Sequence, residues 1–301
     1  MANVAGADGE NGSAPPIRLL GSSDIRALLA QLGKRPTKTL GQNFVHDPNT
    51  IRRVVSAADV RAGECVLEVG PGLGSLTLGL LEVGAVVVAV EIDSALAAEL
   101  PATVARHAPH AAARLAVINA DAMQPLVLPT AMAQPSRLVA NLPYNVAVPV
   151  LLKLLEALPS LQGGLVMVQA EVAQRIAAGP GSRVYGSPSV KLAWYAAVSR
   201  AGSVPRSVFW PAPNVDSELV RFVCRPAPEL ESGFPTRTEV FTVVDAAFAQ
   251  RRKMLRAALA PLLGGPIRAA TVLDAAHVNP TARGETLALA DFVRIAAAAR
   301  L

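Results

Sequence analysis

Residues 65–75, CVLEVGPGLGS, decide the fold that the sequence predicts. The first five residues form an apolar, strand-like run that ends at Gly70, and residues 75–81 follow with a helical pattern. The three glycines between them allow a tight turn and let a ligand approach the backbone. A strand, a glycine turn and a helix in this order favour an open α/β fold with a ligand at the turn. The same turn is also compatible with a purely structural role.

The alternation of strand and helix continues along the chain. Strand-like runs lie at residues 85–90, 115–118, 138–140 and 165–169, and helical runs at 94–100, 146–158 and 172–178. Strands that are apolar on both faces predict a parallel sheet covered by helices. We expect residues 192–199 and 219–223 to add antiparallel edge strands, since no helix of usable length separates them.

A second, helical domain is expected near the C-terminus. Residues 225–235 contain three prolines and one glycine, which is typical of a linker. Residues 239–263, 267–275 and 286–299 carry helical periods and no strand pattern. The sequence therefore predicts an α/β domain over residues 21–225 and a small all-helical domain over 226–301. The first sixteen residues are small, polar and acidic, so we expect a disordered tail over residues 1–20.

Composition limits the class of protein. The chain has 301 residues, of which 51% are hydrophobic and 17% charged, so it has enough apolar side chains for a substantial core. No apolar run reaches the ~18 residues of a membrane span. Two cysteines in strand-like runs form neither a disulfide framework nor a metal site. We expect a cytoplasmic protein without a metal. Its net charge of +5 leans weakly toward a polyanionic partner.

Acidic residues follow the next two strands and indicate an adenosine-type ligand. Glu91 ends the second strand, 91 − 70 = 21 residues after the first glycine, where a carboxylate accepts both ribose hydroxyls. Asp121 follows the third strand, where it would accept from an adenine amine or cap a helix. The last glycine of the dinucleotide pattern is replaced by Ser75, so the NAD fingerprint is incomplete. An acidic rim repels phosphate, and a cationic nucleoside such as S-adenosylmethionine fits better.

The tetrapeptide Asn141-Leu142-Pro143-Tyr144 follows the fourth strand, at the edge of the sheet where open α/β folds bind ligands. It offers an amide oxygen, a proline-fixed turn and an aromatic face, which together suit a flat ring with an exocyclic amine. Taken alone, it would be an ordinary loop, because Asn and Pro are common turn residues.

Several motifs in one order resemble the KsgA family of ribosomal RNA adenine N6-dimethyltransferases, which are related to the Erm methylases. The motifs are LGQNF (40–44), EVGPGLG (68–74), VEID (90–93), DAM (121–123), NLPYN (141–145), VQ (168–169), EVAQRI (171–176), FWPAPNVDS (209–217) and FAQRRK (248–253). They cover residues 37 to 256. Ala170 and Pro188 depart from the pattern at positions that do not touch the expected chemistry.

The resemblance implies a Rossmann-like S-adenosylmethionine-dependent methyltransferase domain and a C-terminal helical domain that binds RNA. Asn43 and Val45 would contact the cofactor from the N-terminal segment, and Gly72 would also bind it. Gly70 would approach its methionyl part, Glu91 its ribose and Asp121 its adenine. Asn141 would stand between the cofactor and the target base. Members of the family methylate two adjacent adenosines, each twice, in a hairpin near the 3′ end of small-subunit rRNA, late in subunit assembly.

The tetrapeptide supplies the expected chemistry. The N6 amine of adenine is a poor nucleophile because its lone pair is delocalised into the ring. Acceptors on its two N–H groups would favour a pyramidal amine, and the Asn141 side-chain oxygen and the Leu142 carbonyl are the candidates. Pro143 would fix the turn, and Tyr144 would stack on the base for ~1–3 kcal/mol. These motifs contain no His or Lys as a strong base, so positioning should supply the rate.

Phe209 is the second expected stacking face. It begins a period-two run with Pro211, Pro213 and Val215, which predicts an extended segment. By the resemblance, Phe209 would stack on a base swung out of its helix, opposite Tyr144. The alternative is an edge strand with Phe209 and Trp210 in the core, and the sequence does not choose between the two.

Clustered cations are the candidates for RNA binding. They are Lys34, Arg35 and Lys38 before the domain, Arg175 and Arg183 within it, and Arg251, Arg252, Lys253 and Arg256 near the C-terminus. We expect the last four on more than one side of a helix, where they suit phosphate contacts. A solvated helix face is the alternative for any one of them.

The leading hypothesis is an enzyme that dimethylates small-subunit rRNA in an assembling ribosomal subunit, as a monomer and away from membranes. An Erm-type methylase of large-subunit rRNA is the second hypothesis. A non-catalytic RNA-binding or assembly factor on the same fold is the third, and the complete tetrapeptide argues against it. An NAD-dependent oxidoreductase is disfavoured by Ser75.

Overall fold

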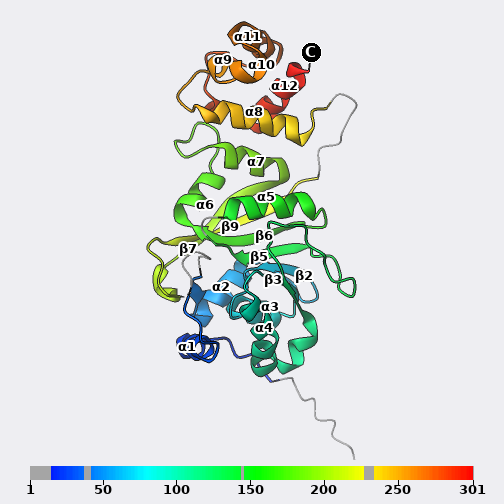
Figure 1. Cartoon of the computed structure of the whole chain (residues 1–301), viewed down its shortest axis with the longest axis vertical. Coiled ribbons are helices and arrows are strands. Elements are labelled where there is room, and N and C mark those ends of the chain that lie inside the picture. Colours follow the sequence, from blue (N-terminus) through cyan, green and yellow to red (C-terminus); the bar gives the residue numbers. More distant parts are fainter. Residues whose placement is uncertain (1–14, 37–41, 144–145, 227–233, 301) are drawn as a thin grey trace, which may run out of the picture.

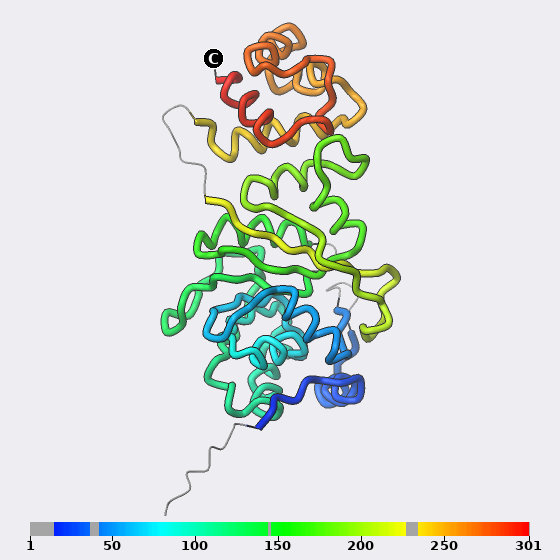
Figure 2. The backbone as a smooth tube through the Cα atoms, turned by 180° about the vertical axis from the view of Figure 1, so that it is seen from behind, coloured from blue at the N-terminus to red at the C-terminus, as the bar shows by residue number. Residues whose placement is uncertain are grey.

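The computed structural model describes residues 15–36, 42–143, 146–226 and 234–300. Two of the expected functional residues, Lys38 and Tyr144, lie outside these ranges, as does most of the expected linker. The described chain forms an elongated molecule with an α/β part and a helical part at one end (Figure 1). Seen from behind, the first described residues lie at the end opposite to the C-terminus (Figure 2).

A seven-stranded sheet forms the centre of the α/β part, in the order β4-β3-β2-β5-β6-β9-β7. Its strands are β2 (Cys65–Val69), β3 (Val86–Glu91), β4 (Leu115–Asn119), β5 (Arg137–Asn141), β6 (Gly163–Gln169), β7 (Ala196–Val204) and β9 (Ser217–Cys224). The first five strands in the spatial order are parallel, and β9 runs antiparallel to both neighbours. The expected parallel sheet is therefore present.

Helices cover both faces of this sheet. One face carries α1 (Ser22–Gln31), α2 (Pro48–Ala58), α3 (Ser75–Glu82), α4 (Ser94–His107) and the 3-10 turn η2 (Pro109–Arg114), and the other carries α5 (Ala147–Ala157), α6 (Ala170–Ile176) and α7 (Ser187–Tyr195). Because strand side chains alternate, β2 sends Val66 into the first layer and Leu67 into the second. Burying a side chain of this size contributes about 1.5–3 kcal/mol, which explains why the strands are apolar on both faces.

Two expectations for the edge of the sheet are wrong in detail. Residues 192–195 are the end of α7, and the strand begins only at Ala196. Pro188, which departs from the family pattern, lies in the first turn of α7, where its fixed φ suits a helix start. Of the two strands expected at the edge, only β7 lies there, because β9 pairs with β6 on one side and β7 on the other.

The expected N-terminal tail does not extend to residue 20. Ile17, Leu19 and Leu20 are buried in the core cluster that contains α1, and the backbone N–H of Arg18 donates to the carbonyl of His107 at 3.2 Å. The prediction of a tail through residue 20 is therefore wrong for residues 17–20, because their apolar side chains pack against α4 and its neighbours.

The helical part consists of α8 (Arg237–Ala249), α9 (Leu255–Ala258), α10 (Ala260–Leu263), α11 (Pro266–Ala275), the 3-10 turn η4 (Gly284–Thr286) and α12 (Leu289–Ala299). The long helix expected over residues 239–263 is broken by a non-helical turn at residues 250–254. The core of this part also includes Tyr185, Val190 and Trp194, which lie in or before α7. The boundary at residue 226 stays a prediction, since packing is continuous across it.

The order of the strands places a crevice at the carboxyl ends of β2 and β5. The chain leaves β2 for β3 and β4 on one side and returns to β5 on the other. Open α/β sheets bind ligands outside the carboxyl ends of their strands at such a reversal of order. The glycine turn follows β2 and the tetrapeptide follows β5, so both lie at this crevice.

Candidate active site

The glycine turn between β2 and α3 depends on backbone conformations that glycine favours. Gly72 has φ 59°, and a Cβ atom there would lie 2.9 Å from Cε1 of Phe44. Gly74 has φ 98°, and a Cβ atom there would lie 2.7 Å from Cδ1 of Leu100. Side chains at these positions would strain the turn and push into its neighbours, so the sequence pattern fixes the shape of the crevice floor.

Glu91 lies at the end of β3 and is held by the backbone on both of its oxygens. The N–H of Gly72 donates to Oε2 at 3.0 Å, and the N–H of Asp93 donates to Oε1 at 2.9 Å. The residue is only 4% exposed, and burial raises the pKa of its carboxyl group. Each oxygen keeps acceptor capacity beyond these bonds, which suits a pair of ribose hydroxyls.

Glu68 is a second buried carboxyl group at the same crevice. It is 1% exposed, and the hydroxyl of Thr77 donates to its Oε2 at 2.7 Å. Burial, together with the nearby charge of Glu91, raises the pKa of Glu68 to about 8. No role was predicted for Glu68 from the sequence, although an ionisable residue inside an apolar strand is itself a signal, because an unpaired charge is costly to bury.

Asp121 lies half-buried after β4, in a turn rather than at the start of a helix. Its Oδ1 accepts from the N–H of Met123 at 2.8 Å. The capping alternative is therefore not what the structure shows, because the side chain closes a local turn. Ile92, at 53% exposure, and Met123, at 36%, are apolar side chains at the same rim. They offer flat apolar surface next to the Asp121 carboxylate.

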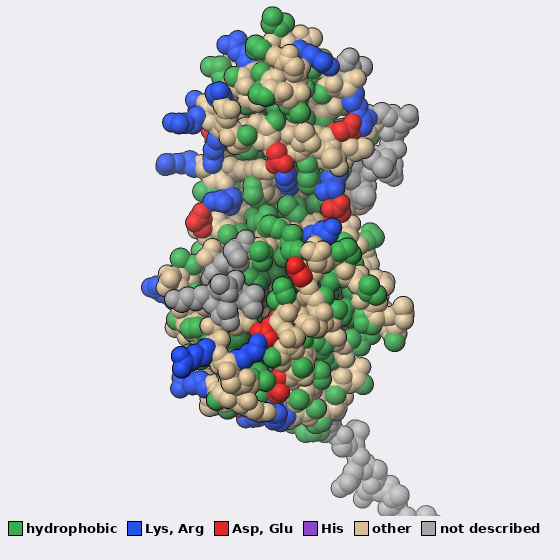
Figure 3. Space-filling view, viewed as in Figure 1, with side chains coloured by type: hydrophobic (Ala, Val, Ile, Leu, Met, Phe, Trp, Pro, Cys, Tyr) green, Lys and Arg blue, Asp and Glu red, His purple; other side chains and the backbone are tan. Residues whose placement is uncertain are grey.

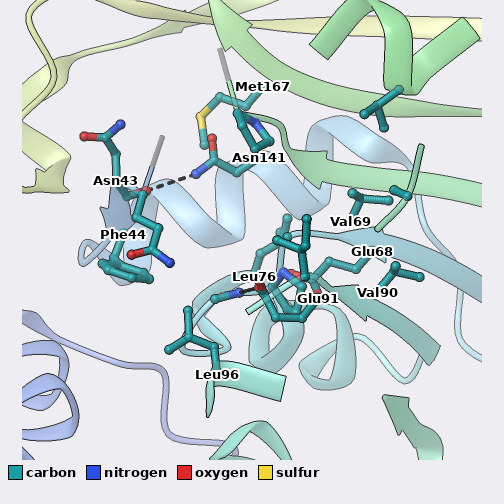
Figure 4. Close-up of a pocket in the computed structure, with 18 of the residues that line it drawn as sticks. Asn43, Phe44, Glu68, Val69, Leu76, Val90, Glu91, Leu96, Asn141 and Met167 are labelled. Atoms are coloured by element: carbon teal, nitrogen blue, oxygen red, sulfur yellow. Dashed lines mark hydrogen bonds between the residues drawn. The ribbon is translucent and has the colours of Figure 1, made fainter. Parts of the chain in front are cut away.

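The side chain of Asn141 is oriented by the N-terminal segment. Its Nδ2 donates to the carbonyl oxygen of Asn43 at 3.2 Å (Figure 4). Since only the NH₂ end of the amide can donate, the amide oxygen lies at the other side of the group. The N–H of Leu142 donates to the carbonyl of Met167 at 3.1 Å, which ties the following turn to β6. The start of the tetrapeptide is therefore held in place.

These groups surround one cavity of about 280 Å³. All seven residues expected to bind the cofactor line it: Asn43, Val45, Gly70, Gly72, Glu91, Asp121 and Asn141. Pro143 also lines it, whereas Leu142 is 1% exposed with its side chain in the core. The lining residue Met167, in the middle of β6, could not be found from sequence, because nothing local separates it from other core residues.

The charges in the cavity wall have one sign. Three carboxyl groups line it, those of Glu68, Glu91 and Asp121, of which Glu68, with its pKa of about 8, is protonated at neutral pH. Among the residues the structure describes, no Lys, Arg or His lines it. Figure 4 shows Glu68 and Glu91 close together, with Asn43 and Asn141 facing each other nearby. Such a wall repels phosphate and attracts a cation. The residues present therefore fit a nucleoside that carries positive charge, which is the chemistry of S-adenosylmethionine.

Phe209 packs in the core. Strand β8 (Phe209–Trp210), which follows the 3-10 turn η3 (Arg206–Val208), pairs antiparallel with β1 (Phe44–Val45), with Phe209 opposite Val45. Phe209 is 3% exposed and is not among the described residues that line the cavity. The structure thus shows the core packing that the sequence left open as an alternative. Stacking on a base stays a prediction, and it would require the Phe209 ring to become accessible.

The expected RNA-binding cations divide into two sets. Lys34 pairs with Asp93 at 2.5 Å, Arg175 with Glu171 at 2.7 Å and Arg251 with Glu285 at 2.8 Å. The side chains of the others have no hydrogen-bond or ion-pair partner in the described part of the chain: Arg35, Arg183, Arg252, Lys253 and Arg256. Figure 3 shows Lys and Arg side chains along one edge, over the helical part and again near α1.

The helix expected for the last four cations is absent. Arg251, Arg252 and Lys253 lie in the turn after α8, and Arg256 lies in the short helix α9. All four are exposed. We call residues 250–254 the basic turn. The prediction of a continuous helix is wrong, since α8 ends at Ala249. Contact of these cations with RNA phosphates stays a prediction.

Comparisons with known proteins place the chain in a family. The model of the family described as "Ribosomal RNA adenine dimethylase" matches residues 33–299. The chain belongs to the ribosomal RNA adenine dimethylase family. It is 62% identical over 279 residues to a protein from Thermobifida fusca, covering 93% of this chain and 96% of that protein. It is 61% identical over 281 residues to a protein from Leifsonia xyli subsp. xyli, covering 93% and 99%. Both are named "Ribosomal RNA small subunit methyltransferase A".

Solved structures agree with membership of the adenine dimethylase family. A dimethyladenosine transferase from Plasmodium falciparum aligns over 84% of this chain and 95% of its own, with a TM-score of 0.71 and 24% identity, which shows the common fold. The 23S rRNA methyltransferase ErmE aligns over 86% and 100%, with a TM-score of 0.63 and 26% identity. The resemblance inferred from the motifs and the Rossmann-like methyltransferase fold are confirmed.

Across the ranges that the structure describes, every helix is too short or too polar to cross a bilayer.

Proposed function

We propose that this protein is an S-adenosylmethionine-dependent rRNA adenine N6-dimethyltransferase that acts on small-subunit ribosomal RNA. Its membership of the adenine dimethylase family and its identity of about 60% to proteins named as small-subunit methyltransferases support the reaction and the substrate class. The proposed targets are two adjacent adenosines in a hairpin near the 3′ end of that RNA, in a subunit that is still being assembled. We further propose that the protein works in the cytoplasm as a monomer.

One structural observation carries the proposal. Three carboxyl groups line the cavity, and among the described residues no Lys, Arg or His does. Asn141 also lines it, and the carbonyl of Asn43 fixes the orientation of its amide. A positively charged nucleoside would be attracted to this wall, and a base amine could reach Asn141 at its side. S-adenosylmethionine, when bound, supplies a methyl group on a positively charged sulfur.

The residues of the chain would then position the amine rather than deprotonate it strongly. The Asn141 amide oxygen and the Leu142 carbonyl would each accept from one N–H of the target amine, so that its lone pair points at the methyl group. Pairing of the Leu142 N–H with the carbonyl of Met167 holds this stretch before the chemistry begins. Preorganised positioning of this kind can lower the barrier to methyl transfer by about 7–11 kcal/mol at best.

The second methyl group places a limit on the pocket. An amine that already carries one methyl has only one N–H left, so one of the two proposed acceptors loses its partner in the second transfer. The site must also leave room for the first methyl. Tyr144, outside the described residues, and Phe209 are the proposed stacking faces that would keep the base in place through both transfers.

The experiment that tests the proposal incubates the purified protein with methyl-labelled S-adenosylmethionine and ribosomal subunits that lack the modification. The label is then located by nuclease digestion and mass analysis. We expect N6,N6-dimethyladenosine in small-subunit RNA. Label in the large subunit would favour the Erm-type alternative, and the absence of any label would favour a non-catalytic assembly factor. Either result would overturn the proposed function.

A further inference from the structure

The basic turn is fastened to a loop of the α/β part. The loop, residues 177–186, connects α6 to α7 and contacts η4 and the basic turn. The N–H of Gly181 donates to the backbone carbonyl of Glu285 at 2.7 Å, and the Tyr185 hydroxyl donates to the carbonyl of Leu287 at 2.8 Å. Tyr185 is 4% exposed and its ring packs edge-on against Phe248 of α8. Hydrogen bonds and a buried ring thus join the two parts of the molecule here.

Arg251 connects all three segments through one guanidinium group. Its Nε donates to Oε2 of Glu285 at 2.8 Å, and its Nη2 donates to the carbonyl oxygen of Arg183 at 2.5 Å. The side chain therefore bridges the basic turn, η4 and the 177–186 loop. The planar fork of an arginine can bind two acceptors at fixed angles, whereas a lysine ammonium acts as a point charge.

The neighbours of Arg251 are used differently. Within the described residues, the side chains of Arg252, Lys253 and Arg256 make no hydrogen bond or ion pair. Arg251 is 41% exposed, but its charge is compensated by Glu285, which is 28% exposed. A cation already paired with a carboxylate offers less net attraction to a phosphate than a free one. These four cations look alike in the sequence, but Arg251 makes an internal contact, whereas Arg252, Lys253 and Arg256 face solvent.

The 177–186 loop leads directly back to the cavity. Strand β6 carries Met167 in the cavity wall, α6 begins at Ala170 as β6 ends, and the loop follows α6. Only one strand end and one short helix separate the cavity from the contacts of Arg251. A change in how the basic turn meets the loop would thus shift the outward-facing cations relative to the site of methyl transfer.

We propose that Arg251 is a positioning residue that sets the placement of the basic turn relative to the active site, rather than a phosphate contact. This inference rests on the proposed function. Arg252, Lys253 and Arg256 hold the RNA backbone, and the bridge from Arg251 to Glu285 and Arg183 fixes the distance between those contacts and the target adenosine. Glu285 is the partner of Arg251 in this role.

Two variants with opposite changes of charge separate positioning from phosphate binding. Arg251→Met removes one positive charge, and Glu285→Ala removes one negative charge. If Arg251 contacted phosphate, the first variant would weaken subunit binding and the second would strengthen it or leave it unchanged. If Arg251 positions the basic turn, both variants lower kcat for methyl transfer by about 10-fold to 10²-fold. A mutation far from the reacting atoms has this effect when it misplaces the bound substrate.

The combined variant and the salt dependence give further readouts. Arg251→Met with Glu285→Ala should cost no more than the larger single effect, since both changes break one contact. The second readout is the slope of log affinity for the subunit against log salt concentration. This slope should be the same in Glu285→Ala as in the wild type. In Arg252→Gln it should flatten by about 0.7–0.9, because one phosphate contact is lost. Arg268→Gln on α11 removes a charge from the same helical part and serves as the matched control.

Hydrogen exchange reports the bridge without relying on activity. The amide of Gly181 should exchange faster in Arg251→Met and Glu285→Ala than in the wild type, whereas amides in the centre of α8 should not change. Unchanged exchange together with unchanged kcat in Glu285→Ala would overturn the inference, as would a flatter salt slope in Arg251→Met alone. Methylation by the wild type separates the proposed function from the proposed role of Arg251. An inactive wild type would contradict the proposed function, whereas an active wild type with unaffected variants would contradict only the role of Arg251.

Discussion

The acidic cavity and the basic turn hold their charges in opposite ways. In the cavity, Glu68 and Glu91 are buried and already bonded to the protein, so their positions are set before any ligand arrives. In the basic turn, Arg252 and Lys253 are exposed and without a side-chain partner among the described residues. A buried, fixed carboxylate such as that of Glu91 suits selection of one small cation, while exposed charges without a partner suit a long polyanion. The difference indicates that chemistry and RNA capture are assigned to separate regions.

The largest expected effect concerns Asn141 in the cavity. Asn141→Ala should lower kcat for methyl transfer by about 10²–10³-fold, the usual cost of removing one preorganised polar group that acts on the reacting atoms. Affinity for ribosomal subunits should not change, because the basic turn is untouched. Asn119→Ala is the matched control, since Asn119 also ends a strand and donates to a backbone carbonyl, that of Glu91, but does not line the cavity. A comparable loss of kcat in both variants would remove Asn141 from the chemistry.

Gly72 tests how rigid the cavity floor is. Gly72→Ala and Gly33→Ala place a methyl group at nearly the same φ, 59° and 60°, at a strain of about 1–2 kcal/mol each. Only Gly72 has a neighbour in the way, the Phe44 ring at 2.9 Å, and nothing lies within 4 Å at Gly33. We expect Gly72→Ala to lose a further ~1–3 kcal/mol in urea unfolding, through overpacking. It should also bind the cofactor more weakly. Equal losses of stability would mean that the Phe44 ring yields freely.

Glu68 makes cofactor binding depend on pH. Its pKa of about 8 means that the free protein holds a proton there at neutral pH, and a bound cation would favour its release. Affinity for S-adenosylmethionine should therefore rise with pH, by at most ~10-fold per unit below about pH 8, and level off above it. Calorimetric titrations across this range would check it. Glu68→Gln should flatten the rise, and an unchanged profile in that variant would assign the effect to another group.

The raised pKa of Glu68 also affects folding stability, and its sign can be worked out. The folded protein keeps the proton up to about pH 8, while the unfolded chain releases it near the ordinary value of 4.5. Folded protein thus binds more protons between these values, so the free energy of unfolding should fall as pH rises through this range. Urea unfolding of the unliganded protein should show a steeper fall for the wild type than for Glu68→Gln. Parallel curves for the two proteins would contradict the burial of an ionisable Glu68.

The smallest expected effect concerns a single exposed cation. Arg252→Gln should weaken subunit binding a few-fold and flatten its logarithmic salt dependence by about 0.7–0.9, with kcat unchanged at saturating substrate. Filter binding at several salt concentrations measures this. A fall in kcat without a change in slope would mean that the residue acts on the chemistry, and the separation between cavity and turn would fail.

Local patterns were enough to predict most of the cavity. A few consecutive residues identify each of three features: the strand before Gly70, the glycine turn, and Glu91 at the end of the next strand. The parallel sheet then brings the carboxyl ends of these strands together. Pro188, in the first turn of α7, was also a local signal for this helix, but residues from 192 onward were expected to form a strand. In this case the signal was present and its meaning was mistaken.

Other features depend on contacts between distant residues and could not be read from the sequence. Phe209 is buried because β8 pairs with β1, about 165 residues earlier in the chain (209 − 44 = 165). Arg251 and Arg252 look identical in the sequence, and only the approach of the 177–186 loop and of Glu285 separates them. Ile17, Leu19 and Leu20 are buried in the same core cluster as Leu96, Leu100 and Val104 of α4, and Arg18 donates to the carbonyl of His107 at the end of that helix. Burial and pairing of this kind follow from the whole fold.

The central claim is that the cavity performs methyl transfer and the basic turn captures RNA. The most direct measurement is single-turnover methylation of unmodified small subunits, at saturating and subsaturating protein, for Asn141→Ala and Arg252→Gln beside the wild type. The account predicts that Asn141→Ala stays slow at saturation while binding subunits normally, and that Arg252→Gln regains the wild-type rate at saturation. Recovery of Asn141→Ala at saturation, or failure of both variants at the same step, would contradict it.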